Sequence, residues 1–177
     1  GKADWEINLG LDNDIFCFNV ESAVELGIIN ELAAAKNKVA SIALRINPEV
    51  DAHTHAKITT GMKENKFGIN LSQLGGVLDK LKEMKNVKLI GIHSHIGSQI
   101  TDMSSFRNLV IRFNEIQEEL EAHGVTVENL NFGGGLGIDY YHPNHLSIPA
   151  FDNYFAAIHK LLQVRPGQQV HFEPGRS

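Results

Sequence analysis

The chain has 177 residues, of which 42% are hydrophobic, so it can bury the core of one compact domain. Its formal net charge is -5, from 16 basic and 21 acidic residues, and it has no block of Lys or Arg that would favour nucleic acid or an anionic membrane. Its one cysteine, Cys17, cannot form an internal disulfide, and no apolar run resembles a membrane span or a signal peptide, so we expect a cytoplasmic protein that binds a small molecule.

The first part of the chain predicts two strands separated by a helix. Residues 15–20 and 41–46 are short runs rich in β-branched and aromatic residues, which is typical of strands. Between them, Ser22 is followed three positions later by Glu25, the pattern of a capping box, and an apolar stripe continues to Ala35. We therefore expect a helix that begins after Ser22.

The remaining chain repeats this alternation. Strands are predicted at residues 87–96, 130–134 and 169–174. A helical stripe runs from Phe106 to Leu120 and stops at Gly124. Another stripe runs over residues 151–161, with Ser147 as its expected cap and Pro149 in its first turn.

Five strands alternating with helices indicate a parallel α/β fold, either an open doubly wound sheet or part of a (β/α)8 barrel. Four of the strands lead into polar or glycine-rich segments: RINPE, HIGSQ, GGGLG and EPGRS. In a barrel the carboxyl ends of the strands converge on one mouth, which would bring these segments to a single site. We therefore predict a partial (β/α)8 TIM barrel. Because a barrel needs eight strands and five are predicted, we expect the domain to be incomplete.

Two histidines, His93 and His95, alternate in the segment GIHSHIGSQI and would point to one face of an extended strand. Such imidazoles could be core residues, zinc ligands or contacts of a bound ring. Together with His53 and His55 they supply four candidate metal ligands, so a metal-dependent barrel hydrolase is an alternative function. The His53/His55 pair lies beyond its strand and no aspartate closes the last strand, so we expect no metal site.

Two further segments suggest an anionic ligand with a basic ring. Three consecutive glycines, Gly133 to Gly135, would let backbone N–H groups approach a phosphate, although a plain tight turn is an equally good interpretation. Their spacing fits neither a dinucleotide fingerprint nor a P-loop. The segment FEPGRS offers Glu173 for a basic nitrogen and Arg176 for a phosphate or carboxylate, with a surface Glu–Arg pair as the alternative. Pyridoxal 5'-phosphate has a matching part for each feature: a phosphate for the glycines, a basic nitrogen for the carboxylate and a flat ring for an imidazole.

These segments resemble the barrel domain of the diaminopimelate decarboxylase family, in the group of pyridoxal-phosphate enzymes that includes alanine racemase and ornithine decarboxylase. The matching runs are FNVESAVEL, ALRINPEVDAHTHAKITTGMKENKFGI, GIHSHIGSQITD, NFGGGLGIDY and HFEPGRS. The runs THAKITTG, KFG and HIGSQ are closer to the diaminopimelate branch than to the ornithine branch. The resemblance implies a single pyridoxal-phosphate-binding barrel domain over residues 1–177, covering approximately strands four to eight.

The resemblance also implies roles for individual residues. Glu173 falls where the family pairs a carboxylate with the pyridine nitrogen, and His95 where it stacks an imidazole on the ring; both would be catalytic. The expected cofactor-binding residues are His95, Ser98, Gly133, Gly134, Gly135, Glu173, Pro174, Gly175, Arg176 and Arg45. Arg176 would also bind the substrate carboxylate. For Arg45 a structural ion pair is the alternative. His93 is expected to be a core histidine without a role, and Lys66 receives none.

The implied activity is the decarboxylation of meso-diaminopimelate to L-lysine and CO2 in lysine biosynthesis, by a homodimer. Glu173 favours decarboxylation over racemisation, because alanine racemases have an arginine at this position. Another pyridoxal-phosphate amino-acid decarboxylase of this fold, or a relative that has lost catalysis, remains an alternative. The family's cofactor-bearing lysine and its C-terminal β-domain, with a cysteine that Cys17 does not match, have no counterpart here. We therefore expect the chain alone to be inactive.

Overall fold

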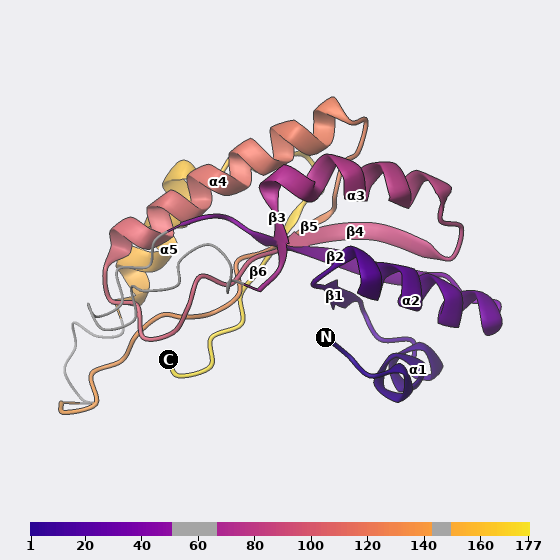
Figure 1. Cartoon of the computed structure of the whole chain (residues 1–177). Coiled ribbons are helices and arrows are strands. Elements are labelled where there is room, and N and C mark those ends of the chain that lie inside the picture. Colours follow the sequence, from indigo (N-terminus) through magenta and orange to yellow (C-terminus); the bar gives the residue numbers. More distant parts are fainter. Residues whose placement is uncertain (51–66, 143–149) are drawn as a thin grey trace.

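Strands and helices alternate along the part of the chain that the computed structural model describes, residues 1–50, 67–142 and 150–177 (Figure 1). The elements in chain order are α1 (Asp4–Asp12), β1 (Phe18–Val20), α2 (Ala23–Ala35), β2 (Ala40–Asn47), β3 (Ile69–Asn70), α3 (Leu71–Glu83), β4 (Val87–His93), α4 (Met103–Ala122), β5 (Asn129–Asn131), α5 (Phe151–Leu161) and β6 (Gln169–His171). None of the helices in these ranges is both long and apolar enough to cross a membrane.

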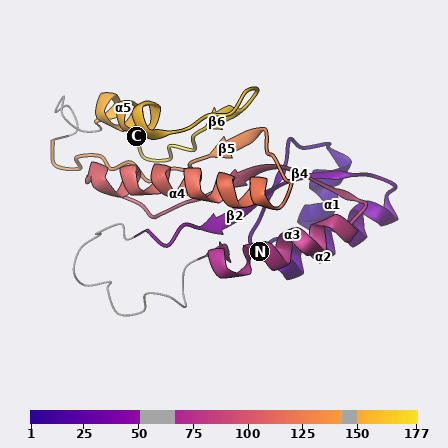
Figure 2. The same ribbon diagram turned by 90° about the horizontal axis from the view of Figure 1, so that it is seen from above.

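The strands form one parallel sheet in the order β1-β2-β4-β5-β6, with the two-residue strand β3 paired to the end of β2. Seen from above, helices α2, α3, α4 and α5 follow one another along the sheet (Figure 2). A doubly wound sheet would reverse its strand order at a switch point. Since the main strands follow one another in chain order, that alternative is wrong and the prediction of a partial (β/α)8 barrel is confirmed.

The strands differ from the predicted ones mainly in where they end. Strand β4 ends at His93 rather than at residue 96, and β5 ends at Asn131 rather than at residue 134. Gly97 and Gly133 have positive φ angles of 137° and 64°, which turn the chain out of the extended conformation. The residues predicted as strand ends therefore form loops at the edge of the sheet.

Two helices and one strand were not predicted. Helix α1 has a weak apolar stripe, because Trp5 and Leu9 are exposed and only a narrow face is buried. Helix α3 contains the adjacent glycines Gly75 and Gly76, which lower its helix propensity. Strand β3 has only two residues and gives no run that a sequence pattern could detect.

The predicted helix caps are partly confirmed. Ser22 caps α2, since its Oγ accepts a hydrogen bond from the Glu25 backbone N–H at 3.1 Å. The Glu25 carboxylate does not return to Ser22 but accepts from the backbone N–H groups of Glu21 and Lys2. Burial raises the pKa of Glu25, but these bonds and the Lys2 charge outweigh it and leave the pKa lowered. Gly124, with φ 74°, ends α4 as predicted.

Helix α5 begins at Phe151 in the structure, with Ala150 at the N-cap position. The predicted cap Ser147 and the predicted first-turn Pro149 lie outside the described residues. The predicted apolar stripe over residues 151–161 coincides with this helix.

An aromatic cluster joins helices α4 and α5 to the carboxyl ends of β5 and β6. The Phe113 ring of α4 stacks on Phe132 with centroids 4.1 Å apart, and Phe106 meets Tyr154 of α5 edge-on at 4.7 Å. The Tyr154 ring in turn lies 5.7 Å from Phe172. Because Phe132 directly precedes the three glycines and Phe172 directly precedes Glu173, this cluster fixes the two segments that carry predicted site residues.

We expect Phe113→Ala to lower the free energy of unfolding by about 3–5 kcal/mol, because it removes a fully buried ring and leaves a cavity. Ile111→Ala, in the same helix but 47% exposed, should change it by no more than ~0.5 kcal/mol. Urea unfolding of both purified variants measures the difference. Equal losses would contradict the packing described here.

Candidate active site

The hydrogen-bonded register of the sheet lines up four side chains at its carboxyl edge. Arg45 of β2 is paired with His93 of β4, His93 with Asn131 of β5, and Asn131 with His171 of β6. Residues in register on neighbouring parallel strands point to the same face of the sheet. The strand ends therefore converge on one site, as a barrel predicts.

Glu173 reaches this row from the loop after β6. Its backbone N–H donates to the Gly133 carbonyl at 2.8 Å, and its Oε1 accepts from Asn131 Nδ2 at 2.9 Å. Its Oε2 lies 3.3 Å from His93 Nε2, and the side chain is 51% exposed. The carboxylate is therefore held by the sheet but still open to a ligand.

His93 is buried, as expected for a core histidine, with 4% of its surface exposed. Burial lowers the pKa of this imidazole; the charge of Glu173 opposes the effect, and the charge of Arg45 adds to it. His93 is therefore neutral at pH 7. Its close approach to Glu173 was not predicted from the sequence, which gave this residue no role.

His95 lies beyond the end of β4, so the alternation of a strand does not relate its direction to that of His93. It is half-buried, and its Nδ1 accepts a hydrogen bond of 3.4 Å from the Gly134 backbone N–H. Burial and the charge of Arg45 lower its pKa, with Glu173 again opposing. Because Nδ1 is the acceptor, the neutral ring carries its proton on Nε2.

The three glycines pack directly against both neighbouring strand ends. A Cβ atom on Gly133, Gly134 or Gly135 would collide with the carbonyl oxygens of Ser94, Glu173 and Gly97 respectively. Gly135 also has a φ of 108°, a conformation that side chains rarely adopt. The loop is therefore more than a plain tight turn, because its backbone joins the segments that contain His95 and Glu173.

The side chain of Gln99 fastens this glycine loop from the neighbouring segment. Its Nε2 donates to the Ile138 carbonyl at 2.5 Å, and its Oε1 accepts from the Ile138 N–H at 3.3 Å. The Ile100 N–H donates to the Gly135 carbonyl at 2.8 Å. These bonds hold the HIGSQ segment and the glycine loop together.

The remaining predicted residues lie around this centre. Ser98, Pro174 and Gly175 are exposed at the same edge of the sheet. Arg176 is exposed too, and its Nη1 donates to the Tyr140 hydroxyl at 2.8 Å. The structure shows no Glu173–Arg176 ion pair among its described residues, so the alternative of a surface pair between them is wrong.

Arg45 forms an ion pair with Glu21, as the alternative to a cofactor-binding role predicted. Its Nη1 lies 2.6 Å from Glu21 Oε1, and its guanidinium carbon lies 5.6 Å from the centre of the exposed Phe67 ring. Its position in the strand-end row nevertheless brings its charge close enough to lower the pKa values of both site histidines. Arg45 therefore contributes to the electrostatics of the site.

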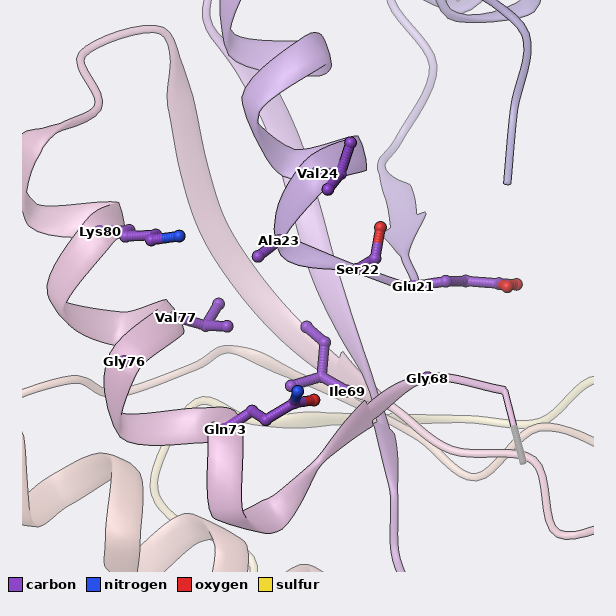
Figure 3. Close-up of a pocket in the computed structure, with 10 residues that line it drawn as sticks. All are labelled: Glu21, Ser22, Ala23, Val24, Gly68, Ile69, Gln73, Gly76, Val77 and Lys80. Carbon is purple, nitrogen blue, oxygen red and sulfur yellow. The ribbon is translucent and has the colours of Figure 1, made fainter. Parts of the chain in front are cut away.

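Several hollows border these elements, among them one lined by Gly133, Gly134 and Pro174 against the aromatic cluster. Another is lined by Asn131, His171 and Glu173 together with Phe16 and Cys17, so it adjoins the strand-end row. A further hollow lies between α2 and α3, where Ala23, Val77 and Lys80 point toward one another (Figure 3). None of the predicted site residues lines the hollow between α2 and α3, so this hollow is not part of the predicted site.

The candidate metal ligands are only partly described. His53 and His55 lie outside the described residues, as does Lys66. In residues 1–50, 67–142 and 150–177, no group of three His, Cys, Asp or Glu side chains could hold a metal ion. His93 and His95 do not form such a group within these ranges.

The geometry fits pyridoxal 5'-phosphate. Glu173 offers an accessible carboxylate for a basic ring nitrogen, and the half-buried His95 offers a neutral imidazole for a flat ring. Gly134 bonds to His95 through its N–H and lies against the Glu173 carbonyl, which places the glycine loop beside both. A phosphate would have to reach this loop from the side of the partly exposed Gly135 and the exposed Ser98, because Gly133 and Gly134 are buried.

Sequence reasoning missed several residues at this site, among them Asn131, Gln99 and Tyr140. Asn131 directly follows an apolar strand and precedes the glycines, a position at which a polar side chain meets the barrel mouth. Gln99 is part of the HIGSQ run, and its backbone has a positive φ of 59° that marks a special turn. No signal in the sequence pairs Tyr140 with Arg176.

Comparison with known proteins points to the same cofactor. A family described as pyridoxal-dependent decarboxylase, pyridoxal binding domain, matches residues 1–177. The chain is 62% identical to a diaminopimelate decarboxylase of Bacteroides thetaiotaomicron, over 100% of this chain and 46% of that protein. It is 40% identical to that of Haemophilus influenzae, over 99% and 42%.

Solved structures agree as well. The crystal structure of a Helicobacter pylori diaminopimelate decarboxylase complexed with L-lysine has a TM-score of 0.86 and 35% identity, covering 99% of this chain and 44% of that one. The Methanocaldococcus jannaschii enzyme in complex with L-lysine has a TM-score of 0.83 and 36% identity, covering 99% and 42%. The chain thus spans less than half the length of these relatives.

We expect Gly135→Ala to destabilise the fold by about 1–3 kcal/mol, because its φ of 108° is strained for alanine and the new Cβ would meet the Gly97 carbonyl. Gly76→Ala, inside α3 with open space around it, should be neutral or stabilising. Thermal unfolding of both variants is the measurement. A Gly135→Ala variant as stable as Gly76→Ala would show that the loop is not packed in this way.

Proposed function

Because the chain belongs to the family of pyridoxal-dependent decarboxylases, we propose that the protein decarboxylates meso-diaminopimelate to L-lysine and CO2 with pyridoxal 5'-phosphate. One observation carries the proposal: Glu173 presents a half-exposed carboxylate at the mouth of the strand ends, held by Asn131. The identity of 62% to a diaminopimelate decarboxylase supports the choice of substrate.

In this proposal the cofactor is held at three points. Glu173 accepts a hydrogen bond from the protonated ring nitrogen, and His95 lies against one face of the ring. The glycine loop, Gly133 to Gly135, would contact the phosphate together with the Ser98 hydroxyl; the N–H groups of Gly133 and Gly134 also donate to Asn131 Oδ1 and His95 Nδ1, which fixes the loop beside the ring site. Pro174 and Gly175 form the turn that lets Arg176 approach the cofactor, and Arg45 contributes its charge at the mouth.

The chemistry divides between cofactor and protein. When bound, pyridoxal 5'-phosphate supplies an electron sink for the pair that the departing carboxylate leaves on the substrate. The negative charge of Glu173 keeps a proton on the ring nitrogen, which strengthens that sink. His95 is neutral, so it would contact the ring face without adding a positive charge. Such a charge would disfavour the proton that Glu173 keeps on the ring nitrogen.

Arg176 is proposed to bind a substrate carboxylate. Its guanidinium donates to the Tyr140 hydroxyl and lies 5.9 Å from the centre of that ring, which fixes the direction of an otherwise exposed side chain. A guanidinium held from one side can offer its remaining N–H groups to a carboxylate. Tyr140 therefore acts as a support for Arg176.

The rest of the proposal concerns organisation. We propose that residues 1–177 act as one cofactor-binding domain, that the protein works as a homodimer and that it lies in the cytoplasm. The match of the family's binding domain to residues 1–177 supports the first part. The other two rest on the resemblance to decarboxylases. Sedimentation equilibrium of the full-length protein distinguishes a dimer from a monomer.

In the full-length protein, Glu173→Gln should lower kcat by about 100-fold or more, roughly 3 kcal/mol of transition-state stabilisation, because glutamine keeps the shape but removes the charge. Steady-state release of CO2 from meso-diaminopimelate at saturating cofactor is the measurement. Glu128→Gln, on the residue just before β5 at the opposite end of the sheet, is the matched control and should retain activity. Wild-type turnover by Glu173→Gln would refute the assigned role.

His95→Ala should weaken cofactor binding by up to about tenfold, because it removes a contact with the ring face rather than a charge. Equilibrium dialysis of the full-length protein against pyridoxal 5'-phosphate measures the affinity. His159→Ala, an exposed histidine on α5, serves as the control and should bind like wild type. Unchanged affinity of His95→Ala would remove His95 from the cofactor site.

A further inference from the structure

His93 has an unmet hydrogen-bonding capacity at the centre of the strand-end row. It is 4% exposed, and in the described part of the chain neither of its ring nitrogens has a partner with hydrogen-bond geometry. A buried polar group left in this way costs free energy and calls for an explanation. Its Nε2 lies 3.3 Å from Glu173 Oε2.

The Glu173 carboxylate lies where it can accept a hydrogen bond from the His93 ring. Its Oε1 is held by Asn131 Nδ2 at 2.9 Å, while its Oε2 faces the imidazole. The glutamate side chain is half exposed, whereas His93 is fixed by burial. A small rotation of the carboxylate is therefore enough to align it with the Nε2–H bond of the imidazole.

We propose that His93 is a positioning residue whose Nε2–H donates to Glu173 Oε2, so that His93 and Asn131 together hold both oxygens of the carboxylate. This arrangement fixes the plane in which Glu173 meets a ligand nitrogen. The hydrogen bond itself stands on the geometry of this chain; its use to orient Glu173 toward a pyridine ring rests on the proposed function.

The charges around His93 favour a neutral ring. Burial lowers its pKa most strongly, the charge of Glu173 raises it, and the charge of Arg45, with that of His95 when it is protonated, lowers it further. Arg45 faces it from β2, His95 follows it on the same segment, and Glu173 comes from the loop after β6. A neutral imidazole has one N–H, so only the tautomer with the proton on Nε2 can donate to Glu173.

This bond would also serve the proposed chemistry. Donors to a carboxylate favour its charged form. With Asn131 and His93 both donating, the proton shared between Glu173 and a ring nitrogen stays on the nitrogen. A histidine that only packs in the core would have neither a fixed tautomer nor an effect on Glu173.

The first test needs no cofactor and no activity. In cofactor-free full-length protein with 15N-labelled histidine, long-range 1H–15N spectra report which nitrogen of His93 is protonated. We expect the Nε2–H tautomer, and a further fall in the pKa of His93 in Glu173→Gln, because the charge that raises it is removed. A proton on Nδ1, or a His93 unaffected by Glu173→Gln, would overturn the proposal even if the protein is a decarboxylase.

The second test compares two neutral substitutions in the full-length enzyme with pyridoxal 5'-phosphate and meso-diaminopimelate. The side-chain nitrogen of His93→Gln can reach the position of Nε2, whereas that of His93→Asn is too short. We expect His93→Asn to lower kcat by about tenfold with KM little changed, and His93→Gln to restore most of the loss.

The outcomes separate the two proposals. Equal losses in His93→Gln and His93→Asn would overturn the positioning role, because the donor would then not matter. If the tautomer is as expected but the protein does not act on meso-diaminopimelate, the His93–Glu173 bond stands and the proposed function fails. The tautomer experiment uses wild type and Glu173→Gln, whose changed side chain is half exposed, so it does not depend on a core substitution folding.

Discussion

The site depends on the register of the parallel strands. Hydrogen bonding between β2, β4, β5 and β6 places Arg45, His93, Asn131 and His171 at one level, and the loop after β6 then brings Glu173 onto this row. A slip of one residue in any of these pairs would turn the row to the other face of the sheet. The apolar core below the row, with Phe132 and Phe172 against helices α4 and α5, keeps this register.

The electrostatics of the row follow from that packing. Glu173 has one oxygen bound by Asn131 and the other near His93, while Arg45 is paired with Glu21 at the edge of the sheet. Burial keeps both histidines neutral, so the carboxylate of Glu173 is the charged group that a ligand meets at the centre. A basic nitrogen matches this arrangement, and the glycine loop beside it suits an anionic group of the same ligand.

The sequence predicted the fold class from local patterns, and it placed several candidate residues at the strand ends, although their roles came from the family resemblance. Ser22 indicated the start of α2, and Gly124 indicated the end of α4. Polar residues after apolar runs indicated the strand ends. What could not be predicted depends on contacts between distant segments: the Glu25 carboxylate bonds to Lys2 instead of completing a capping box, and the Tyr140 hydroxyl accepts a hydrogen bond from Arg176. His93 looked like an ordinary core histidine, because no local pattern reveals a glutamate that follows it by eighty residues in the sequence.

The most direct test of this account is a crystal structure of the full-length protein with pyridoxal 5'-phosphate, in which the distance from the pyridine nitrogen to the Glu173 carboxylate is measured. The account predicts a charge-assisted hydrogen bond of about 2.7–2.9 Å. It also predicts that the other contacts of the carboxylate, to Asn131 and His93, are retained. A ring nitrogen that faces another group, with Glu173 turned away from the cofactor, would contradict it.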